Sequence, residues 1–180
     1  MKQGYTNYLK WREPNLESTI NKAKNIKMII SDVDGVLTDG KIIIANNGEE
    51  LKTFNSQDGM GINLAQKLGI RFAIITGRIS RIVEIRAEEL NIKDVYQDVD
   101  DKVEVFELLI DKYNLCDEEV AYIGDDLNDI PILNRAGLAA TVANGVKKVK
   151  DTVDYIATRK GGEGAVREII DFIIFYKNYK

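Results

Sequence analysis

Residues 26–38 read IKMIISDVDGVLT, and this stretch decides the fold. A short apolar run ends at Ser31 and is followed at once by two acids, Asp32 and Asp34. Such a run is typical of a strand buried in a parallel sheet. Ligand sites of doubly wound sheets lie at the carboxyl ends of the strands, so both carboxylates are expected at the mouth of a cleft. Two acids in that position are costly to bury together unless a cation holds them.

The rest of the chain alternates similar apolar runs with segments of helical periodicity. This alternation predicts an α/β fold, a single Rossmann-like doubly wound parallel sheet. Further strands are expected at residues 71–75, 95–97, 120–123, 138–142 and 154–156. Helices are expected at residues 58–68, 79–90, 102–114, 128–135 and 164–177. Apolar residues at helical spacing in these segments are expected in the core: Leu64, Leu68, Ile82, Ile85, Leu108, Leu109, Ile169, Ile170 and Ile173.

Two segments depart from the alternation. Residues 41–45 and 50–54 are rich in strand-forming residues and flank the turn sequence Asn-Asn-Gly-Glu, which predicts a β-hairpin at about 41–54 that projects from the sheet. Residues 1–25 are polar, with a weakly helical stretch at 16–24, and are expected to form an N-terminal extension. We expect residues 26–180 to be one domain, whose C-terminal helix and tail begin near 160.

Composition narrows the function classes. The 180 residues carry 25 basic and 29 acidic side chains, a net charge of −4, which argues against binding to nucleic acid or to an anionic membrane. There is no histidine, so catalytic triads and zinc sites built on imidazole are excluded. Cys116 is the single cysteine, and no apolar stretch approaches the roughly 20 residues of a membrane span. A cytoplasmic location is expected.

A second acidic cluster, Gly-Asp-Asp-Leu-Asn-Asp at 124–129, follows the predicted strand 120–123. Taken alone, it is equally well explained as a solvated turn with a capping aspartate. If this strand and the first one are neighbours, however, three or four carboxylates converge on one point. A site built only from oxygen ligands suits Mg²⁺.

Two other strand ends offer groups that a phosphate would need. Thr76 ends the strand 71–75 and is expected to open a helix, so its hydroxyl and the nearby amides would face the positive end of the helix dipole. Lys102 follows the strand 95–97 through an acidic turn. It is either an ordinary surface lysine or a cation that offsets the clustered carboxylates and a phosphoryl group.

The motifs Asp-x-Asp-Gly-Val-Leu-Thr at 32–38, Thr76, Lys102 and Gly-Asp-Asp-x-x-Asp at 124–129 resemble, in order and spacing, those of the haloacid dehalogenase superfamily of phosphatases. The resemblance implies that Asp32 is the nucleophile and Asp34 the general acid and base. It also implies that Asp32, the backbone carbonyl of Asp34 and Asp125 bind Mg²⁺, while Thr76 and Lys102 hold phosphoryl oxygens. Asp126 and Asp129 match acidic motif positions, and Thr38 is expected to brace the loop.

Further motifs are Asn-Gly-Glu-Glu-Leu-Lys at 47–52, Phe-Asn-x-x-Asp-Gly-x-Gly-Ile at 54–62, Ile-Ile-Thr-Gly-Arg at 74–78 and Lys-Gly-Gly-Glu-Gly-Ala-Val-Arg-Glu at 160–168. With them the chain more closely resembles the small capless branch of 3-deoxy-D-manno-octulosonate 8-phosphate phosphatases, over residues 23–171. This resemblance implies a sugar-acid phosphate as substrate, in lipopolysaccharide precursor biosynthesis. The spacing of the motifs leaves no room for a cap domain, so a neighbouring subunit is expected to complete each active site. The resemblance also implies a homotetramer. The positions that match sugar-binding residues of this branch are Asn55, Ser56, Gln57, Asp58, Gly59, Arg78 and Arg86.

Alternatives stay open at this point. A phosphatase of nine-carbon ulosonate 9-phosphates would use the same catalytic set, although Arg78 favours the eight-carbon sugar. A receiver-type phosphoacceptor domain also combines Asp, Thr, Lys and Mg²⁺, but it places its acidic pair far before the phosphoacceptor. A non-catalytic oligomerisation module is disfavoured because every catalytic position is intact.

Overall fold

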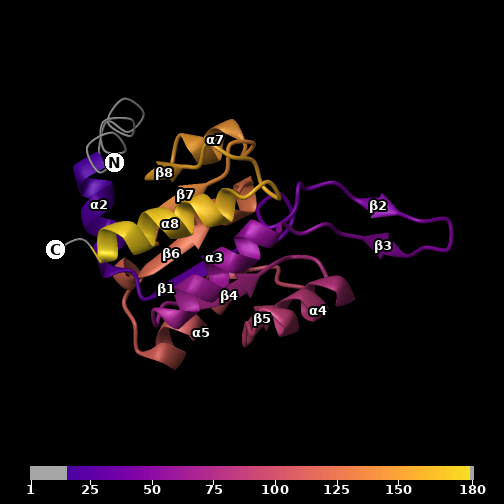
Figure 1. The fold of residues 1–180 in the computed structure, drawn as a ribbon, viewed down its shortest axis with the longest axis horizontal. Helices are drawn as coiled ribbons and strands as arrows, with labels where there is room; N and C mark the ends of the chain where they lie inside the picture. Colours follow the sequence, from indigo (N-terminus) through magenta and orange to yellow (C-terminus); the bar gives the residue numbers. More distant parts are fainter. Residues whose placement is uncertain (1–15, 179–180) are drawn as a thin grey trace.

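The computed structural model describes residues 16–178. Six parallel strands form one sheet in the order β5-β4-β1-β6-β7-β8 (Figure 1). The strands are β1 (Met28–Ser31), β4 (Arg71–Ile75), β5 (Asp94–Tyr96), β6 (Val120–Ile123), β7 (Leu138–Thr141) and β8 (Tyr155–Ile156). The chain builds outward from β1 to β5 and then returns to place β6 on the other side of β1. This reversal beside β1 is where doubly wound sheets hold their ligands, and the predicted α/β fold is confirmed.

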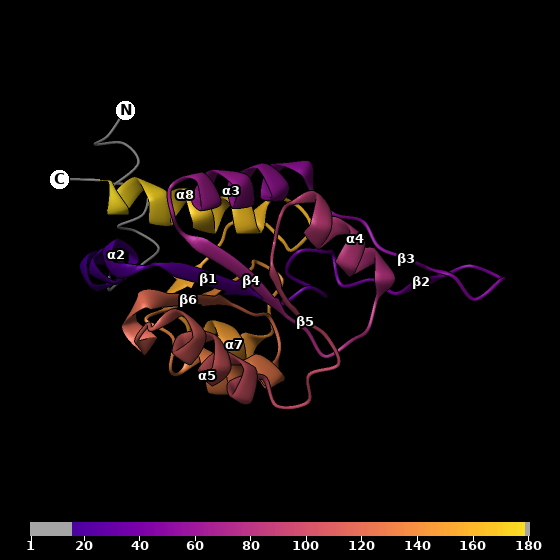
Figure 2. The same cartoon turned by 90° about the horizontal axis from the view of Figure 1, so that it is seen from below.

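Helices cover both faces of the sheet (Figure 2). One face carries α2 (Leu16–Asn25), α3 (Ser56–Lys67), α4 (Arg81–Glu89) and α8 (Ala165–Lys177), and the other carries α5 (Lys102–Tyr113), α6 (Ile130–Leu133) and α7 (Lys147–Lys150). Strand β1 serves both layers, because Ile29 packs in the first core cluster while Met28 and Ile30 pack in the second. Successive side chains of a strand point to opposite faces, so a strand covered on both sides is apolar throughout.

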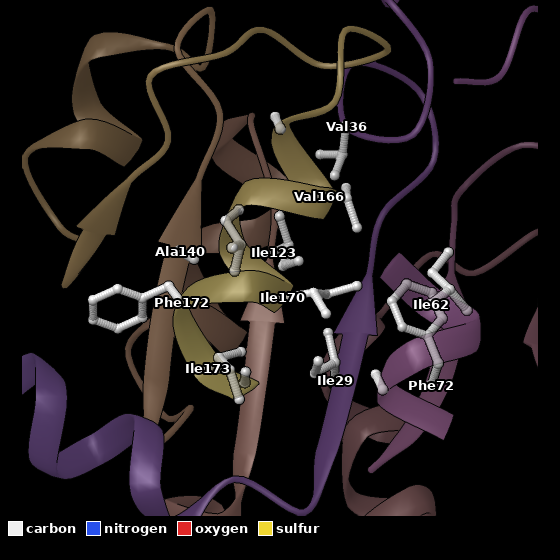
Figure 3. Close-up of a cluster of buried hydrophobic side chains, with 14 of the residues drawn as sticks. Ile29, Val36, Ile62, Phe72, Ile123, Ala140, Val166, Ile170, Phe172 and Ile173 are labelled. Carbon is white, nitrogen blue, oxygen red and sulfur yellow. The ribbon is translucent and has the colours of Figure 1, made fainter. Parts of the chain in front are cut away.

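Helix α8 supplies much of the first core cluster. Val166, Ile170 and Ile173 lie against the sheet, close to Ile29 of β1 and Ile123 of β6 (Figure 3). These side chains are fully buried. The apolar spacing along this helix therefore reflects core packing, as the sequence predicted.

The predicted hairpin is present and projects away from the body of the molecule (Figures 1 and 2). Its antiparallel strands are β2 (Ile43–Ile44) and β3 (Glu50–Leu51), each shorter than expected. The turn between them places Gly48 at φ +84°, a left-handed conformation that glycine adopts without strain. An isolated two-stranded ribbon has only one partner per strand, which explains why the regular pairing is short.

The helix predicted at 128–135 is wrong in its extent. A 3₁₀ turn, η2 (Leu127–Asp129), comes first, and α6 then spans only Ile130–Leu133, with a proline at its start. Asp126 caps η2 through a hydrogen bond from the Leu127 amide, so the acidic cluster is held in a tight turn and not in a helix. The short helix α7 and the 3₁₀ turn η1 (Asp117–Glu119) were not predicted.

Three expected core residues are about half exposed: Leu68, Ile85 and Leu108. Helix α4 buries Val83 and Ala87, so Ile85 lies on the opposite side of that helix. Leu68 is the C-cap of α3, where the chain turns away from the core. The expectation failed because an apolar residue inside a helical segment need not lie on its packed face.

The helix expected at 16–24 is present as α2, which contacts α8. The Nζ atom of Lys22 donates a hydrogen bond of 2.5 Å to Asp154, just before β8. The remainder of the proposed N-terminal extension, residues 1–15, lies outside the described residues. Within residues 16–178, no helix has both the length and the apolar character needed to cross a membrane.

Candidate active site

The carboxyl ends of three central strands bring the predicted catalytic residues together. Ser31, the last residue of β1, is in register with Ile74 of β4 and Ile123 of β6. Asp32 therefore leaves the sheet between Thr76, which follows β4, and the acidic cluster, which follows β6. The convergence of these strand ends, expected if β1 and β6 are neighbours, is confirmed by the strand order.

Lys102 is buried among carboxylates and is not a surface lysine. Only 2% of its side chain is exposed. Its Nζ atom donates to Asp32 Oδ2 at 2.8 Å and to Asp129 Oδ1 at 2.7 Å. Lys102 is the first residue of α5, and Asp101 caps that helix by accepting a hydrogen bond from Val103 N. The helix start thus directs the ammonium group toward the end of β1.

Asp129 organises this cluster. Its side chain is fully buried. Its Oδ1 atom accepts a hydrogen bond from Lys102 and another, of 2.7 Å, from the hydroxyl of Tyr122. Its Oδ2 atom accepts hydrogen bonds from the backbone amides of Asp125 at 2.9 Å and Asp126 at 3.2 Å. With both oxygens engaged twice, the Asp129 carboxylate shapes the loop and orients Lys102. Tyr122 is a residue that the sequence analysis missed, because its place inside an apolar strand indicated only core packing.

Asp125 lies beside the same cluster. Oxygen atoms of Asp32, Asp125 and Asp129 lie within 4.8 Å of one another. Asp125 also approaches the loop after β1 so closely that a Cβ atom on Gly35 would lie 2.1 Å from its Oδ2. Gly35 has φ +95°, so both its conformation and this contact require glycine.

The electrostatics of the cluster fit a divalent cation. Burial, together with the charges of Asp32 and Asp129, raises the pKa of Asp125 to about 7. Burial also raises the pKa of Asp32, although Lys102 opposes the shift. For Lys102, burial acts to lower the pKa, but Asp32 and Asp129 outweigh it and raise the value. Three carboxylates thus face a single ammonium, and the excess negative charge and the oxygen-only donors suit a cation such as Mg²⁺.

Asp34 lies on the loop that follows Asp32. The expectation that Thr38 braces this loop is confirmed, because Thr38 Oγ1 accepts hydrogen bonds from Gly35 N at 3.3 Å and Gly40 N at 3.2 Å. The side chain of Asp34 forms an ion pair with Lys52, and its Oδ2 lies 3.6 Å from Arg78 Nε. Lys52 is a second residue for which the sequence analysis predicted no role.

Thr76 is where the sequence predicts it, but its relation to the next helix is different. The hydroxyl-bearing residue is buried at the end of β4, and Thr76 N donates to Tyr96 O at 3.0 Å. Helix α4 begins only at Arg81, with Ser80 as its N-cap. The expectation that Thr76 opens a helix is therefore wrong, because four residues separate it from the first helical turn and its dipole.

Three of the predicted sugar-binding side chains contact the C-terminal segment. Asn55, the N-cap of α3, donates from Nδ2 to Gly162 O at 3.2 Å. Gln57 Oε1 accepts from Arg159 at 2.5 Å, and Asp58 Oδ1 accepts from the Arg167 amide at 2.7 Å. These bonds hold the segment before α8 and the first turn of α8 against the start of α3.

The remaining candidates lie nearby. Arg86, Asp58 and Gly59 line one small pocket, and a Cβ atom on Gly59 would lie 2.4 Å from the guanidinium of Arg86. Ser56 is exposed at the first position of α3. Arg78 is 47% exposed and pairs with Glu50 at 2.8 Å. Among the predicted sugar-binding residues, Arg78 therefore combines an exposed charged group with a position next to Asp34.

The glycines before α8 pack directly on the Asp34 loop. Gly162 N donates to Val36 O at 3.1 Å. A Cβ atom on Gly161 would lie 1.7 Å from Gly35 O, so only glycine permits this approach of two backbones. The C-terminal segment is therefore part of the wall of the site.

Comparison with known proteins identifies the family. A model of haloacid dehalogenase-like hydrolases matches residues 81–170. The 3-deoxy-D-manno-octulosonate 8-phosphate phosphatase of Escherichia coli strain K12 is 45% identical to this chain over 161 residues, which are 89% of this chain and 86% of that protein. The chain belongs to this phosphatase family. The protein of the same name from Yersinia pestis is 43% identical over the same shares of both chains.

Solved structures of the 3-deoxy-D-manno-octulosonate 8-phosphate phosphatase family share the fold. The Moraxella catarrhalis enzyme, solved with magnesium, phosphate and the sugar acid, is 42% identical, with a TM-score of 0.89 over 91% of this chain and 94% of that one. The cobalt-bound Haemophilus influenzae phosphatase is 38% identical, with a TM-score of 0.84 over 87% and 91% of the two chains. As in the capless branch, the intervals from Asp34 to Thr76 and from Thr76 to Lys102 contain no separate cap domain.

Proposed function

We propose that this chain is a Mg²⁺-dependent phosphomonoesterase that hydrolyses 3-deoxy-D-manno-octulosonate 8-phosphate to the free sugar acid and phosphate. The observation that carries the proposal is the cluster of Asp32, Asp125 and Lys102 at the carboxyl ends of the central strands, in a chain 45% identical to phosphatases of that name. We also propose that the released sugar acid is used in the synthesis of lipopolysaccharide precursors, as the family resemblance implies. The receiver and non-catalytic alternatives are not favoured.

The catalytic residues act in two steps. In the first, an oxygen of Asp32 attacks phosphorus, and Asp34 gives a proton to the departing sugar oxygen, which leaves an aspartyl phosphate. In the second, Asp34 takes a proton from water, and that water hydrolyses the acyl phosphate. Asp32, the backbone carbonyl of Asp34 and Asp125 would hold Mg²⁺, which supplies positive charge to the phosphoryl group.

Thr76 and Lys102 hold the phosphoryl oxygens. An ammonium group has three donors, and Lys102 uses two of them on Asp32 and Asp129. The third donor makes only a long hydrogen bond of 3.5 Å to the Tyr122 hydroxyl, which a phosphoryl oxygen could replace. The buried Thr76 hydroxyl completes this cradle.

Arg78 and Arg86 bind the sugar acid together with the segment from Asn55 to Gly59. A guanidinium group suits the carboxylate of the substrate because it can donate two parallel hydrogen bonds. The bonds from Asn55 and Asp58 to the C-terminal segment support this role, because they fix the start of α3 beside Arg86.

Substrate identity is tested by phosphate release with Mg²⁺ from a parallel panel. The panel contains 3-deoxy-D-manno-octulosonate 8-phosphate, nine-carbon ulosonate 9-phosphates and hexose phosphates. We expect kcat/KM for the eight-carbon substrate to exceed the others by at least about 100-fold, or about 2.7 kcal/mol of transition-state binding. A preference for a nine-carbon substrate would contradict the assignment, and a flat profile would contradict the sugar-binding residues.

Cation binding is expected to depend on pH. Because Asp125 has a pKa of about 7 without a cation, Mg²⁺ must displace a proton at lower pH. Because folding raises the pKa of Asp125, its proton stabilises the folded protein at acid pH, and this stabilisation is lost as pH rises through about 7. Above that pH, bound Mg²⁺ restores the lost stability. The Mg²⁺-induced rise in Tm should therefore be larger at pH 8 than at pH 6. An equal rise at both pH values, or a rise retained by Asp125→Asn, would contradict this prediction.

We also propose a homotetramer that assembles through the hairpin and whose active sites are completed by neighbouring subunits. Four large apolar side chains of the hairpin are at least 44% exposed: Ile42, Ile43, Ile44 and Leu51. Apolar side chains grouped on so small an element favour burial against other copies. Residues 26–180 form the phosphatase domain of each subunit and residues 1–25 an extension, and the proposed location is the cytoplasm.

Ile44→Asp should convert the assembly to monomers, because Ile44, the last residue of β2, is 66% exposed and a charge there opposes burial. Light scattering measures the mass, and we expect phosphatase activity to fall by about tenfold or more as water enters the open site. The matched control is Leu108→Asp, a half-exposed leucine on α5 outside the hairpin. Monomers that keep full activity would contradict the completion of the site by neighbours.

A further inference from the structure

Lys52 is an unusually buried lysine at the base of the hairpin. It lies one residue beyond β3, and only 2% of its side chain is exposed. Lysine side chains ordinarily keep their ammonium group in water, and burial of that charge is costly unless it is paired. Lys41, at the start of the same hairpin, shows the usual behaviour with 75% of its side chain exposed.

The partners of Lys52 belong to a small network of opposite charges. Its Nζ atom forms an ion pair with Asp34 Oδ1 and lies 3.5 Å from Glu50 Oε1. Arg78 closes the network from the solvent side, at 2.8 Å from Glu50 Oε1 and 3.6 Å from Asp34 Oδ2. Two acids and two bases balance, so the buried ammonium has its charge matched by groups on both the hairpin and the catalytic loop.

The two oxygens of Asp34 have different contacts in this network. Oδ1 accepts a hydrogen bond from Lys52 Nζ and lies within 3.5 Å of the Thr38 hydroxyl. Oδ2 is buried and accepts no hydrogen bond from any group in residues 16–178. Arg78 Nε lies 3.6 Å from Oδ2, so the orientation of the carboxylate depends mainly on the ion pair that Oδ1 forms with Lys52.

We propose that Lys52 is a positioning residue for the reaction, which holds the carboxyl group of Asp34 in the orientation that lets it exchange a proton with the leaving alcohol. This inference rests on the proposed phosphatase function. In the first step the bond from Asp32 to phosphorus forms, the bond from phosphorus to the sugar oxygen breaks, and the proton on the Asp34 carboxyl group passes to that oxygen. Lys52 touches neither the substrate nor phosphorus and acts through Asp34.

A comparison of leaving groups tests the proposal. An alkyl phosphate needs its departing oxygen to be protonated, whereas p-nitrophenyl phosphate releases a stable anion without a proton. We expect Lys52→Met, in the full chain with Mg²⁺, to lower kcat/KM for the sugar phosphate by about 100-fold and for p-nitrophenyl phosphate by less than about threefold. The parameter kcat/KM is compared because it reports the first step, before the aspartyl phosphate is hydrolysed.

Two further variants complete the experiment. Lys52→Gln keeps a hydrogen-bond donor and is expected to show a smaller loss with the same dependence on the leaving group, so it replaces Lys52→Met if the latter does not fold. Lys41→Met, the exposed lysine of the same hairpin, should leave both activities within about twofold. Equal losses on both substrates, an increase in KM alone, or no loss on the sugar phosphate would overturn the inference.

A wrong substrate assignment can be distinguished from a wrong role for Lys52. If the unmodified protein prefers another alkyl phosphate of the panel, the same ratio is measured with that substrate, because the reasoning depends on an alcohol leaving group and not on the sugar. Absence of phosphatase activity in the unmodified protein would overturn both the function and the role of Lys52.

Discussion

Asp32→Asn should abolish phosphate release while the protein still folds. The amide cannot attack phosphorus, so we expect kcat to fall by at least about 10⁴-fold. Folding should tolerate the change, because the buried ammonium of Lys102 keeps Asp129 as an anionic partner at 2.7 Å. An amide oxygen can still accept the hydrogen bond of 2.6 Å from Val33 N. Phosphate release and thermal unfolding, each with and without Mg²⁺, measure the two effects.

Asp126→Asn is the matched control for this prediction. Asp126 is an exposed acid next to Asp125, and its Oδ1 caps a 3₁₀ turn through Leu127 N, a bond that asparagine preserves. We expect its activity to stay within about twofold of the unmodified protein. Substantial turnover by Asp32→Asn would refute the nucleophile assignment.

Lys102→Met should have the largest effect on stability. The substitution leaves Asp32 and Asp129 buried without their shared ammonium, and removal of one partner from a buried ion pair costs about 3–5 kcal/mol. The two carboxylates raise the pKa of Lys102 despite its burial, so the ammonium is charged at neutral pH and its loss is felt there. Activity should also be lost, because the phosphoryl group loses a cationic partner.

Urea denaturation with Mg²⁺ and with a chelator checks this result. The loss in the free energy of unfolding should be larger in the chelator, since Mg²⁺ replaces part of the missing positive charge. Lys147→Met is the control, because Lys147 is 87% exposed and its pair with Asp151 contributes at most about 1 kcal/mol. An equal, small change for both variants would show that the buried cluster does not depend on Lys102.

The strands and the catalytic positions were largely predictable from local sequence. Buried parallel strands are continuous apolar runs, and the residue after such a run lies at the carboxyl edge whatever the rest of the chain does. Asp32, Thr76 and Asp125 were placed at strand ends for this reason. The extent of the helix at 128–135 was not predictable, because Asp126 and Asp129 favour a capped turn over a helix in this loop.

Sequence by itself determined the ends of the three central strands, the absence of imidazole chemistry and the resemblance that the family comparison confirmed. Only the tertiary structure decided how those residues act on one another. Lys102 and Lys52 are buried, and each oxygen of Asp129 accepts two hydrogen bonds, whereas Oδ2 of Asp34 accepts none. All of these features depend on which residues distant in the chain lie beside these side chains. Charge effects of this kind depend on distance and burial, neither of which a local pattern contains, and so they appear only when the strand ends, the hairpin and α5 meet.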